Sequence, residues 1–184
     1  TVDKYSLLYP NLNIVFNPEF LTERSANLDF INASRVIIGG PTVLSDKVEK
    51  LYRNRFPYVK IVKTDAKSAE FIKYMCNCFF ATKISFMNEM FLLATKLDFD
   101  WQKIMEGFVA DGRIGNSHLD VPGHDGDYGF GGKCFPKDLN ALIGFFQDNE
   151  IDPHILKAAW ERNKVVRKNR NWEHIEGAVS KDKK

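Results

Sequence analysis

The stretch DAKSAEFIKYMCNCFFATKISFMNEMFLLATKL, residues 65–97, decides the fold of this chain, and it contains neither glycine nor proline. Its apolar residues recur at helical spacing, at positions 72, 75, 76, 79, 80, 84, 87, 90, 91 and 94. The pattern predicts one long, mostly buried helix. A helix this apolar on most sides needs more cover than one small domain supplies, so we expect a homodimer with this helix at its centre.

The residues before the long helix predict part of an α/β sheet. Short β-branched runs bounded by Asn, Pro and Gly predict strands at 14–16 and 35–38, and a third strand is expected at 58–63. A helix is expected over about 46–55, with Ser45 as its N-cap. The alternation of strand, helix and strand is typical of a parallel sheet.

The residues after the long helix predict more helices around an irregular loop. Helices are expected over 100–107, 135–149 and 153–170. The Gly- and Asp-rich stretch 111–132 predicts a long loop, and loops of this length are usually functional or disordered.

Composition narrows the class of protein. The net charge of +2 gives no global bias toward nucleic acid, and 44% hydrophobic residues with 15 Phe predict a substantial core. Three cysteines without a regular framework favour a reducing compartment, and neither a signal peptide nor a membrane-spanning run is evident, so we expect a cytoplasmic protein. Cys76 and Cys78 fall on opposite helix faces and the four histidines lack metal-site spacing, so no metal site is expected.

The stretch GFGGKCFPKD, residues 129–138, places a cysteine between glycines and a proline. Pro136 favours a first helical turn, so Cys134 is expected where a loop enters a helix. Helix N-termini favour a thiolate, Lys137 adds positive charge, and Asp138 lies one turn beyond Cys134. The alternative is a small, buried, apolar cysteine.

Polar side chains also interrupt apolar surfaces elsewhere in the chain. Lys73, Asn77 and Asn88 share one side of the long helix, and they either form a solvated stripe or meet polar partners. Glu19 and Glu23 follow an expected strand directly. At a strand end two carboxylates can hold hydroxyl groups or act as a base, and the alternative is a charged first turn that faces solvent.

Together these segments resemble the UDP-glucose/GDP-mannose 6-dehydrogenase family, and within it most resemble the members that oxidise UDP-glucose. The matching segments are NPEFLTERSA with RVIIGG, AEFIKYMCNCFFATKISFMNE, and DGRIGNSH followed by GFGGKCFPKDLNAL. They occur in the family's order and cover nearly the whole chain. The resemblance implies an oxidoreductase that converts UDP-glucose to UDP-glucuronate, a polysaccharide precursor, and reduces two NAD.

The resemblance also implies roles for individual residues. Cys134 would attack an aldehyde to form a thiohemiacetal and then a thioester, which water hydrolyses. Asp138 would orient or deprotonate that water. Lys73 and Asn77 would stabilise the developing oxyanion or hold sugar hydroxyls, and Glu19 would be a catalytic, substrate-side glutamate.

Four further residues take binding roles by the same resemblance. Glu23 and Lys137 would lie near the NAD cofactor, and Gly131 would line the sugar-nucleotide site. Arg113 would reach the sugar nucleotide bound to a neighbouring subunit, which agrees with the expected dimer.

The chain lacks one sequence motif that is typical of the family. The GxGxxG dinucleotide fingerprint is not in the sequence, so we expect that this chain alone does not turn over NAD. The fold class is then an α/β remnant of a Rossmann-type parallel sheet, residues 1–64, followed by a mostly α-helical dimerisation and catalytic domain with one long central helix, residues 65–165. Residues 166–184 would be a tail or linker.

Other functions remain open at this point. GDP-mannose or a UDP-N-acetylhexosamine is the alternative substrate, and a non-catalytic dimerisation or sugar-nucleotide-binding module is the alternative class. The basic run RNKVVRKNRN, residues 162–171, lacks the interleaved aromatics of a nucleic-acid site, so we interpret it as a solvated basic face and expect neither nucleic-acid nor membrane partners.

Overall fold

The computed structural model describes residues 2–179, apart from the side chain of Glu23. The chain forms two compact units, of which one ends at Met75 and the other begins at Cys76. Helix α4, Ala66–Lys96, confirms the long helix expected over 65–97 and contributes residues to both units. Its length follows from the absence of any helix-breaking residue.

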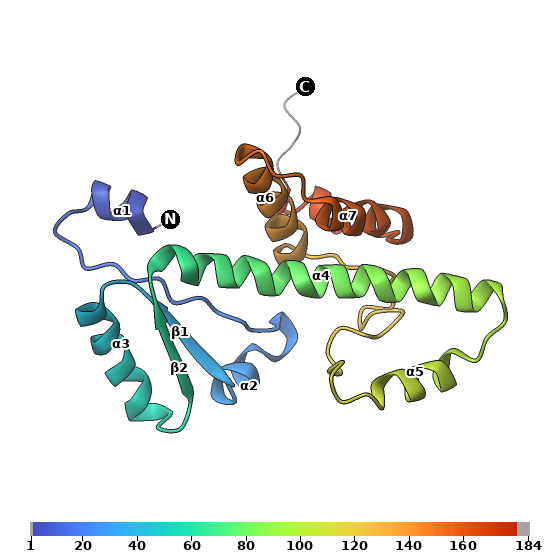
Figure 1. Cartoon of the computed structure of the whole chain (residues 1–184), viewed down its shortest axis with the longest axis horizontal. Helices are drawn as coiled ribbons and strands as arrows, with labels where there is room; N and C mark the ends of the chain where they lie inside the picture. Colours follow the sequence, from blue (N-terminus) through green and yellow to red (C-terminus); the bar gives the residue numbers. More distant parts are fainter. Residues whose placement is uncertain (1, 180–184) are drawn as a thin grey trace. The chain divides into compact units, whose positions relative to one another are not determined.

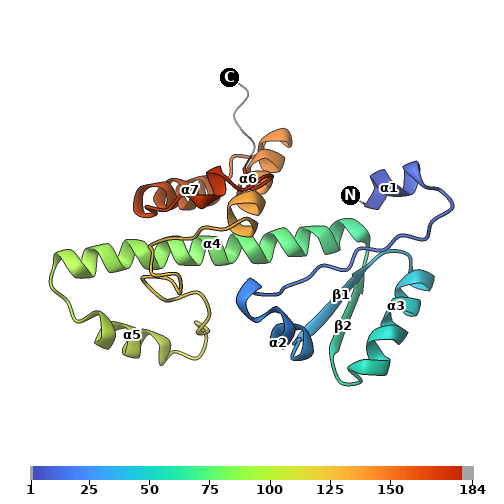
Figure 2. The ribbon, with the colours of Figure 1, turned by 180° about the vertical axis from the view of Figure 1, so that it is seen from behind.

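The first unit contains a two-stranded parallel sheet in which β1, Arg35–Gly39, pairs with β2, Lys60–Thr64. Helix α3, Thr42–Arg55, connects the strands and packs beside them, as Figures 1 and 2 show. The other elements of this unit are α1 (Val2–Leu8), η1 (Glu23–Ser25) and α2 (Ala26–Ile31). A parallel pair with a helical crossover is the arrangement that the sequence pattern predicted.

Two expectations for the first unit were wrong. Residues 14–16 form no strand, because Phe16 makes only an isolated antiparallel bridge to Gly39. Ser45 is not an N-cap, because α3 begins at Thr42 and the Ser45 hydroxyl donates to the Gly40 carbonyl from inside the helix. Pro41 occupies the N-cap position instead, which moves the helix start by about one turn.

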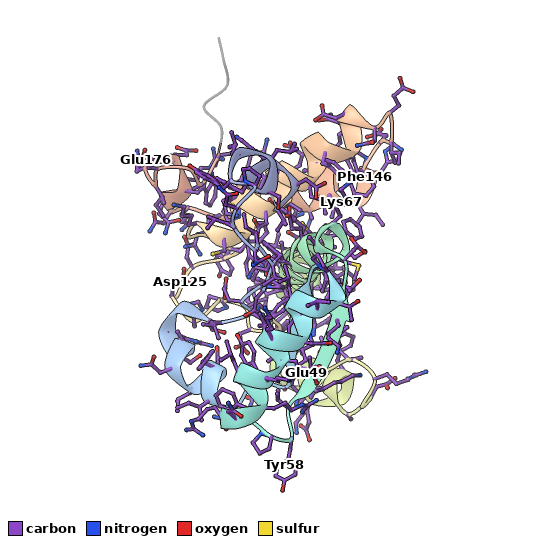
Figure 3. The ribbon with its side chains drawn as sticks, turned by 90° about the vertical axis from the view of Figure 1, so that its left-hand side faces the viewer. Glu49, Tyr58, Lys67, Asp125, Phe146 and Glu176 are labelled. Carbon is purple, nitrogen blue, oxygen red and sulfur yellow. The ribbon has the colours of Figure 1, made fainter. Side chains whose placement is uncertain are left out.

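The turn between α3 and β2 lies at the surface of the first unit. Tyr58 lies in this turn, is 97% exposed and points outward in Figure 3. The β1 strand is the best-buried part of the unit, and Ile38 is fully buried.

Gly39 is required where β1 meets the start of α4. A Cβ added there would lie 2.4 Å from the Ala69 Cβ and 2.9 Å from the Asp65 carbonyl oxygen. The close approach of strand and helix therefore depends on the missing side chain.

The second unit is helical and confirms the predicted order of elements. Its helices besides α4 are α5 (Trp101–Val109), α6 (Cys134–Asp148) and α7 (His154–Val166), followed by the 3-10 turn η2 (Asn171–Glu173). The Asp100 side chain caps α5 by accepting a hydrogen bond from the Lys103 N–H at 3.1 Å. Helix α7 ends earlier than the sequence predicted, at Val166 rather than near 170.

Two hydrophobic clusters hold the second unit together. Met87 of α4 packs with Leu119 and Val121 from the long loop, and partly buried aromatic residues of α4 and α5 surround them. A series of aromatic contacts joins Phe130, Phe135, Trp160 and Trp172. These clusters fix the loop and the start of α6 against α7.

Part of α4 in the second unit presents apolar side chains to the surface. Phe79, Phe86, Leu92 and Leu93 are between 44% and 64% exposed. No helix among the described residues is both long enough and apolar enough to cross a bilayer.

Candidate functional site

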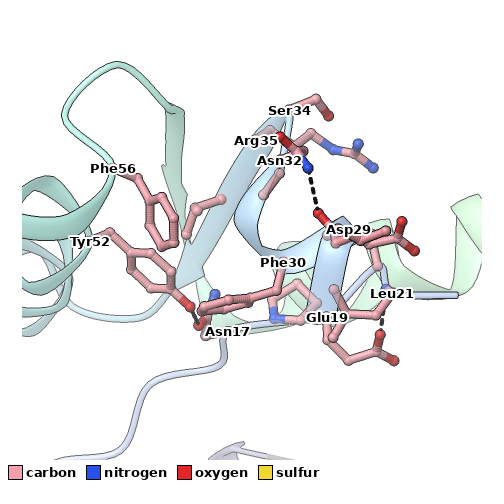
Figure 4. Close-up of a pocket in the computed structure, with 15 residues that line it drawn as sticks. Asn17, Glu19, Leu21, Asp29, Phe30, Asn32, Ser34, Arg35, Tyr52 and Phe56 are labelled. Atoms are coloured by element: carbon pink, nitrogen blue, oxygen red, sulfur yellow. Dashed lines mark hydrogen bonds between the residues drawn. The ribbon is translucent and has the colours of Figure 1, made fainter. Parts of the chain in front are cut away.

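The segment NPEF in the first unit is anchored to the sheet by Asn17. The Asn17 amide donates to the Ile37 carbonyl of β1 at 2.7 Å, and its oxygen accepts from the Tyr52 hydroxyl of α3 at 2.5 Å. Figure 4 shows this pair at one side of a pocket of about 360 Å³. Asn17 thereby fixes the backbone two residues before Glu19.

Glu19 and Lys73, both predicted site residues, form an ion pair. The Lys73 ammonium donates to Glu19 Oε1 at 2.9 Å and to the Glu19 carbonyl oxygen at 2.6 Å. The second carboxylate oxygen accepts from the Leu21 N–H at 2.7 Å. The Lys73 side chain is 18% exposed and that of Glu19 is 54% exposed, so the carboxylate faces solvent while the amine is mostly covered.

The pocket in Figure 4 lies beside this ion pair and belongs entirely to the first unit. Phe20 forms part of its wall, and the Arg35 guanidinium stacks over the Phe20 ring at 4.3 Å. Asp29 lines another part, where the hydrogen bond from the Thr22 N–H holds the pKa of Asp29 below its usual value. Glu23, predicted to lie near a cofactor, has a side chain outside the described residues.

In the second unit, Cys134 is the first residue of α6 and is exposed. Pro136 occupies the first turn, where its missing N–H costs no helical hydrogen bond. This confirms the expected entry from loop to helix and contradicts the alternative of a buried apolar cysteine. The first N–H groups of such a helix have no acceptor within it.

Asp138 lies one turn beyond Cys134, and its side chain is only 3% exposed. Its carboxylate accepts a hydrogen bond from the Asn77 amide at 2.5 Å and pairs with the Lys137 ammonium. Burial, together with the Asp138 charge, raises the pKa of the nearby Cys78 thiol to about 12. Asn77 and Asn88 are both buried, so the interpretation of a solvated stripe is wrong for these two residues.

Arg113 lies on the long loop, away from any covering side chain. It is 89% exposed and pairs through two nitrogens with the Asp111 carboxylate, which lowers the pKa of Asp111 and raises that of Arg113. The next residues are held by Lys83 of α4, whose ammonium donates to the carbonyls of Ile114 and Gly115 at 3.3 and 2.8 Å. Burial lowers the pKa of Lys83.

Gly131 lies where side chains from beyond α7 approach the loop. A Cβ on Gly131 would lie 2.6 Å from Arg167 Nη2 and 2.7 Å from Asn171 Oδ1. Asn163 and Arg167 are buried, so a solvated basic face is the wrong interpretation for them. Sequence reasoning did not identify them as buried residues. The only local indication of burial in this run was its asparagines.

The described residues do not fit a dinucleotide cofactor. Gly39 ends β1 and Gly40 follows it, and both precede α3, where Rossmann folds place phosphate-binding glycines. The protein itself occupies the space beside both glycines. A Cβ on Gly40 would lie 2.9 Å from Val15 Cγ1, and one on Gly39 would meet Ala69. We therefore derive no step through NAD from these residues, and the cofactor roles of Glu23 and Lys137 stay predictions. Over the described part of the chain, no three His, Cys, Asp or Glu side chains gather as metal ligands.

Comparisons with known proteins agree with the resemblance. The sequence profile of the UDP-glucose/GDP-mannose dehydrogenase family, central domain, matches residues 67–165. UDP-glucose 6-dehydrogenase of Rickettsia conorii is 40% identical over 154 residues, which is 84% of this chain and 34% of that protein. The chain thus spans about a third of the length of this relative.

Solved structures give the same result. A UDP-glucose dehydrogenase from Pyrobaculum islandicum superposes with a TM-score of 0.74 at 36% identity, covering 82% of this chain and 34% of its own. A GDP-mannose dehydrogenase from Pseudomonas aeruginosa superposes with a TM-score of 0.52 at 28% identity, covering 84% and 34%. Because the profile matches more than half of the residues and the fold agrees, the chain belongs to the UDP-glucose/GDP-mannose dehydrogenase family.

Proposed function

We propose that this chain is the part of a nucleotide-sugar dehydrogenase that carries the catalytic thiol, and that the enzyme oxidises UDP-glucose to UDP-glucuronate. The observation that carries the proposal is the pair of Cys134 and Asp138 on α6. The thiol is exposed at the first position of the helix, and the carboxylate is buried one turn later and bonded to Asn77. A thiol needs access to a substrate, whereas a carboxylate that directs a proton needs a fixed position.

In the proposed chemistry, Cys134 adds to the carbonyl carbon of the sugar aldehyde. A C–S bond forms, and the carbonyl oxygen becomes an oxyanion that hydrogen-bond donors stabilise. Loss of a hydride from the adduct to a nicotinamide acceptor, which would be supplied by an NAD-binding domain joined to this chain, would convert it to a thioester. Water then attacks its carbonyl carbon, the C–S bond breaks, and the carboxylate product and the Cys134 thiol are released. Asp138 orients or deprotonates this water, while the Asn77 amide keeps the carboxylate in place.

By their match to the family's residues, Lys73 and Glu19 would take part in the same reaction. The covered ammonium of Lys73 provides positive charge for an oxyanion. Glu19 is more than half exposed, so its carboxylate is accessible to a sugar hydroxyl without breaking its bond to Lys73. The ion pair supports these roles because each side chain holds the other in one position.

Dimerisation through α4 is part of the proposal. An almost wholly apolar groove of about 270 Å³ lies between α4 and α5 and includes Phe86, Leu93, Phe99 and Ile104, which are 40% to 55% exposed. Such a surface is typical of an interface rather than of a monomer. The exposed Arg113, held by Asp111, would then reach the sugar nucleotide of the neighbouring subunit.

A comparison of substrates tests the proposed function. The chain is joined to a complete NAD-binding domain, and NADH formation is measured with UDP-glucose, GDP-mannose and a UDP-N-acetylhexosamine. We expect the highest kcat/KM with UDP-glucose and no turnover by the chain on its own. A higher kcat/KM with another sugar nucleotide would identify that compound as the substrate in place of UDP-glucose. If none of the three is turned over, a non-catalytic module is favoured.

A further inference from the structure

The run RNKVVRKNRN, residues 162–171, places three side chains against the loop that leads to Cys134. Asn163 lies in the last turn of α7, Arg167 caps the end of that helix, and Asn171 begins η2. Asn163 is fully buried, Arg167 is 4% exposed and Asn171 is half-buried. A solvated face would leave all three exposed.

Asparagine side chains bond the backbone of this loop at three points. The Gly129 N–H donates to Asn88 Oδ1 of α4 at 3.0 Å, and the Gly132 N–H donates to Asn171 Oδ1 at 2.9 Å. Between them, the Phe130 N–H donates to Asn163 Oδ1 at 2.7 Å, and the Asn163 amide donates back to the Phe130 carbonyl at 3.0 Å. The three carboxamides therefore satisfy an irregular backbone as a neighbouring strand would.

Arg167 holds the residues just before the glycines. Its guanidinium pairs with Asp125 at 2.6 Å and with Asp127 at 3.4 Å, and it donates to the Tyr128 carbonyl. Because the arginine side chain is 2% exposed, these partners provide the compensation that a buried cation needs.

The glycines of the loop make these contacts possible. Gly129 has φ of +65°, and a Cβ on it would lie 2.3 Å from Asn163 Oδ1. Gly131 leaves room for both Arg167 and Asn171. Two of the glycines that precede the cysteine thus admit the side chains that bind the loop.

No side-chain hydrogen bond caps the start of α6. Its N-cap residue, Lys133, has a helical backbone conformation and makes no side-chain cap hydrogen bond. The hydrogen bond from the Gly132 N–H to Asn171 fixes the backbone two residues before Cys134. The start of a helix without its own cap depends on such an anchor.

We propose that Asn163, Arg167 and Asn171 are positioning residues for Cys134, because they fix the backbone of residues 128–132 and so set the first turn of α6. The proposal deepens the proposed function, since Cys134 is the proposed nucleophile. It assigns a role to a segment outside the residues that the family resemblance singled out.

The test compares Asn171→Leu, which removes the accepting oxygen, with Asn171→Asp, which keeps one. Two readouts are taken on the chain itself: hydrogen–deuterium exchange of residues 129–134, and the rate at which iodoacetamide alkylates Cys134. A synthetic peptide of residues 129–140 gives the rate of an unpositioned thiol. Asn149→Leu is the matched control, because Asn149 bonds the Phe145 carbonyl at the opposite end of α6.

We expect Asn171→Leu to increase exchange at Gly132 about tenfold and to move the alkylation rate about fivefold toward that of the peptide. Asn171→Asp should restore both values, and Asn149→Leu should leave both unchanged. If leucine lowers the Tm, Asn171→Ala repeats the measurement without the added apolar side chain.

Equal rates for the wild-type chain and the peptide would overturn the proposal, as would an Asn171→Leu variant that matches the wild type in both readouts. Neither readout requires a sugar nucleotide or NAD. A failure of the dehydrogenase proposal would therefore leave this result unaffected, and the two failures are distinguishable.

Discussion

Cys78 and Cys134 differ in how far each thiol is exposed to solvent. Cys78 is buried in α4, and burial with the charge of Asp138 raises the pKa of its thiol to about 12. Cys134 is exposed at the start of α6. Because the thiolate is the reactive form of cysteine, the fold keeps one thiol inert and leaves the other accessible.

This contrast predicts selective alkylation. At pH 8 a thiol with a pKa of about 12 is ionised in roughly one molecule in 10⁴, so Cys78 should remain unmodified while iodoacetamide labels Cys134. Peptide mapping by mass spectrometry measures both sites in the folded chain, and a denatured sample serves as the control in which both react. Equal labelling of the two thiols in the folded chain would contradict the described burial.

At the scale of single residues, sequence predicted the position of Cys134 well and its supports poorly. Proline and the helical spacing after Cys134 locate the helix start, because those signals are local. The partners of Arg167 lie some forty residues earlier in the chain, at Asp125 and Asp127. Spacing along one helix carries no information on such tertiary contacts, so the run 162–171 looked like a solvated face.

Helices and strands follow the same division between local and tertiary signals. Helix α4 was predicted to within one residue at each end, because its lack of Gly and Pro is a local property. The strand expected at 14–16 depends on a neighbour to pair with, and only the bridge between Phe16 and Gly39 forms there. Helix α3 begins about one turn earlier than predicted. Pro41 takes the N-cap position, and the Ser45 hydroxyl donates to the Gly40 carbonyl from inside the helix.

Substitution of glycine by alanine should have opposite effects on the free energy of unfolding at Gly39 and at Gly107. Gly39→Ala places a Cβ 2.4 Å from Ala69 and should destabilise the chain by about 1–3 kcal/mol. Gly107→Ala, in α5, meets nothing within 4 Å and should stabilise by about 0.5–1 kcal/mol through helix propensity. Urea unfolding curves measure both, and stabilisation by Gly39→Ala would show that β1 and α4 are not packed as described.

The loop before the glycines should weaken in acid. Burial alone would raise the pKa of Asp125 and Asp127, but other effects outweigh it and hold both below the usual 3.8. At Asp125 the largest of these is the hydrogen bond from Arg167, and at Asp127 they are hydrogen bonds from backbone N–H groups and the charge of Arg167. Carboxylates with a lowered folded pKa contribute stability that is present above about pH 4 and is lost as the pH falls through the folded pKa.

The measurement for this element is Tm between pH 5 and pH 2. The wild-type chain should lose more Tm over this range than the double variant Asp125→Asn, Asp127→Asn, whose side chains do not titrate. An equal loss in both proteins would mean that the pairing with Arg167 does not contribute to the acid dependence.

At the scale of the whole molecule, the apolar surface of α4 and α5 predicts self-association. The double variant Phe86→Asp, Leu93→Asp places charges in the groove between these helices and should convert a dimer to a monomer in light scattering. Leu51→Asp is the control, because Leu51 is 70% exposed on α3 and lies outside the groove. A wild-type chain that is monomeric at high concentration would contradict the proposed interface.

The most direct test of the proposed function is Cys134→Ser in a dehydrogenase that joins this chain to a complete NAD-binding domain. The rate of UDP-glucuronate formation should fall by about three orders of magnitude or more, since serine is far less ionised than cysteine at neutral pH. The Cys78→Ser variant is the matched control and should retain most of the activity. A Cys134→Ser enzyme that keeps a tenth of the wild-type rate would contradict an obligatory thiol at this position.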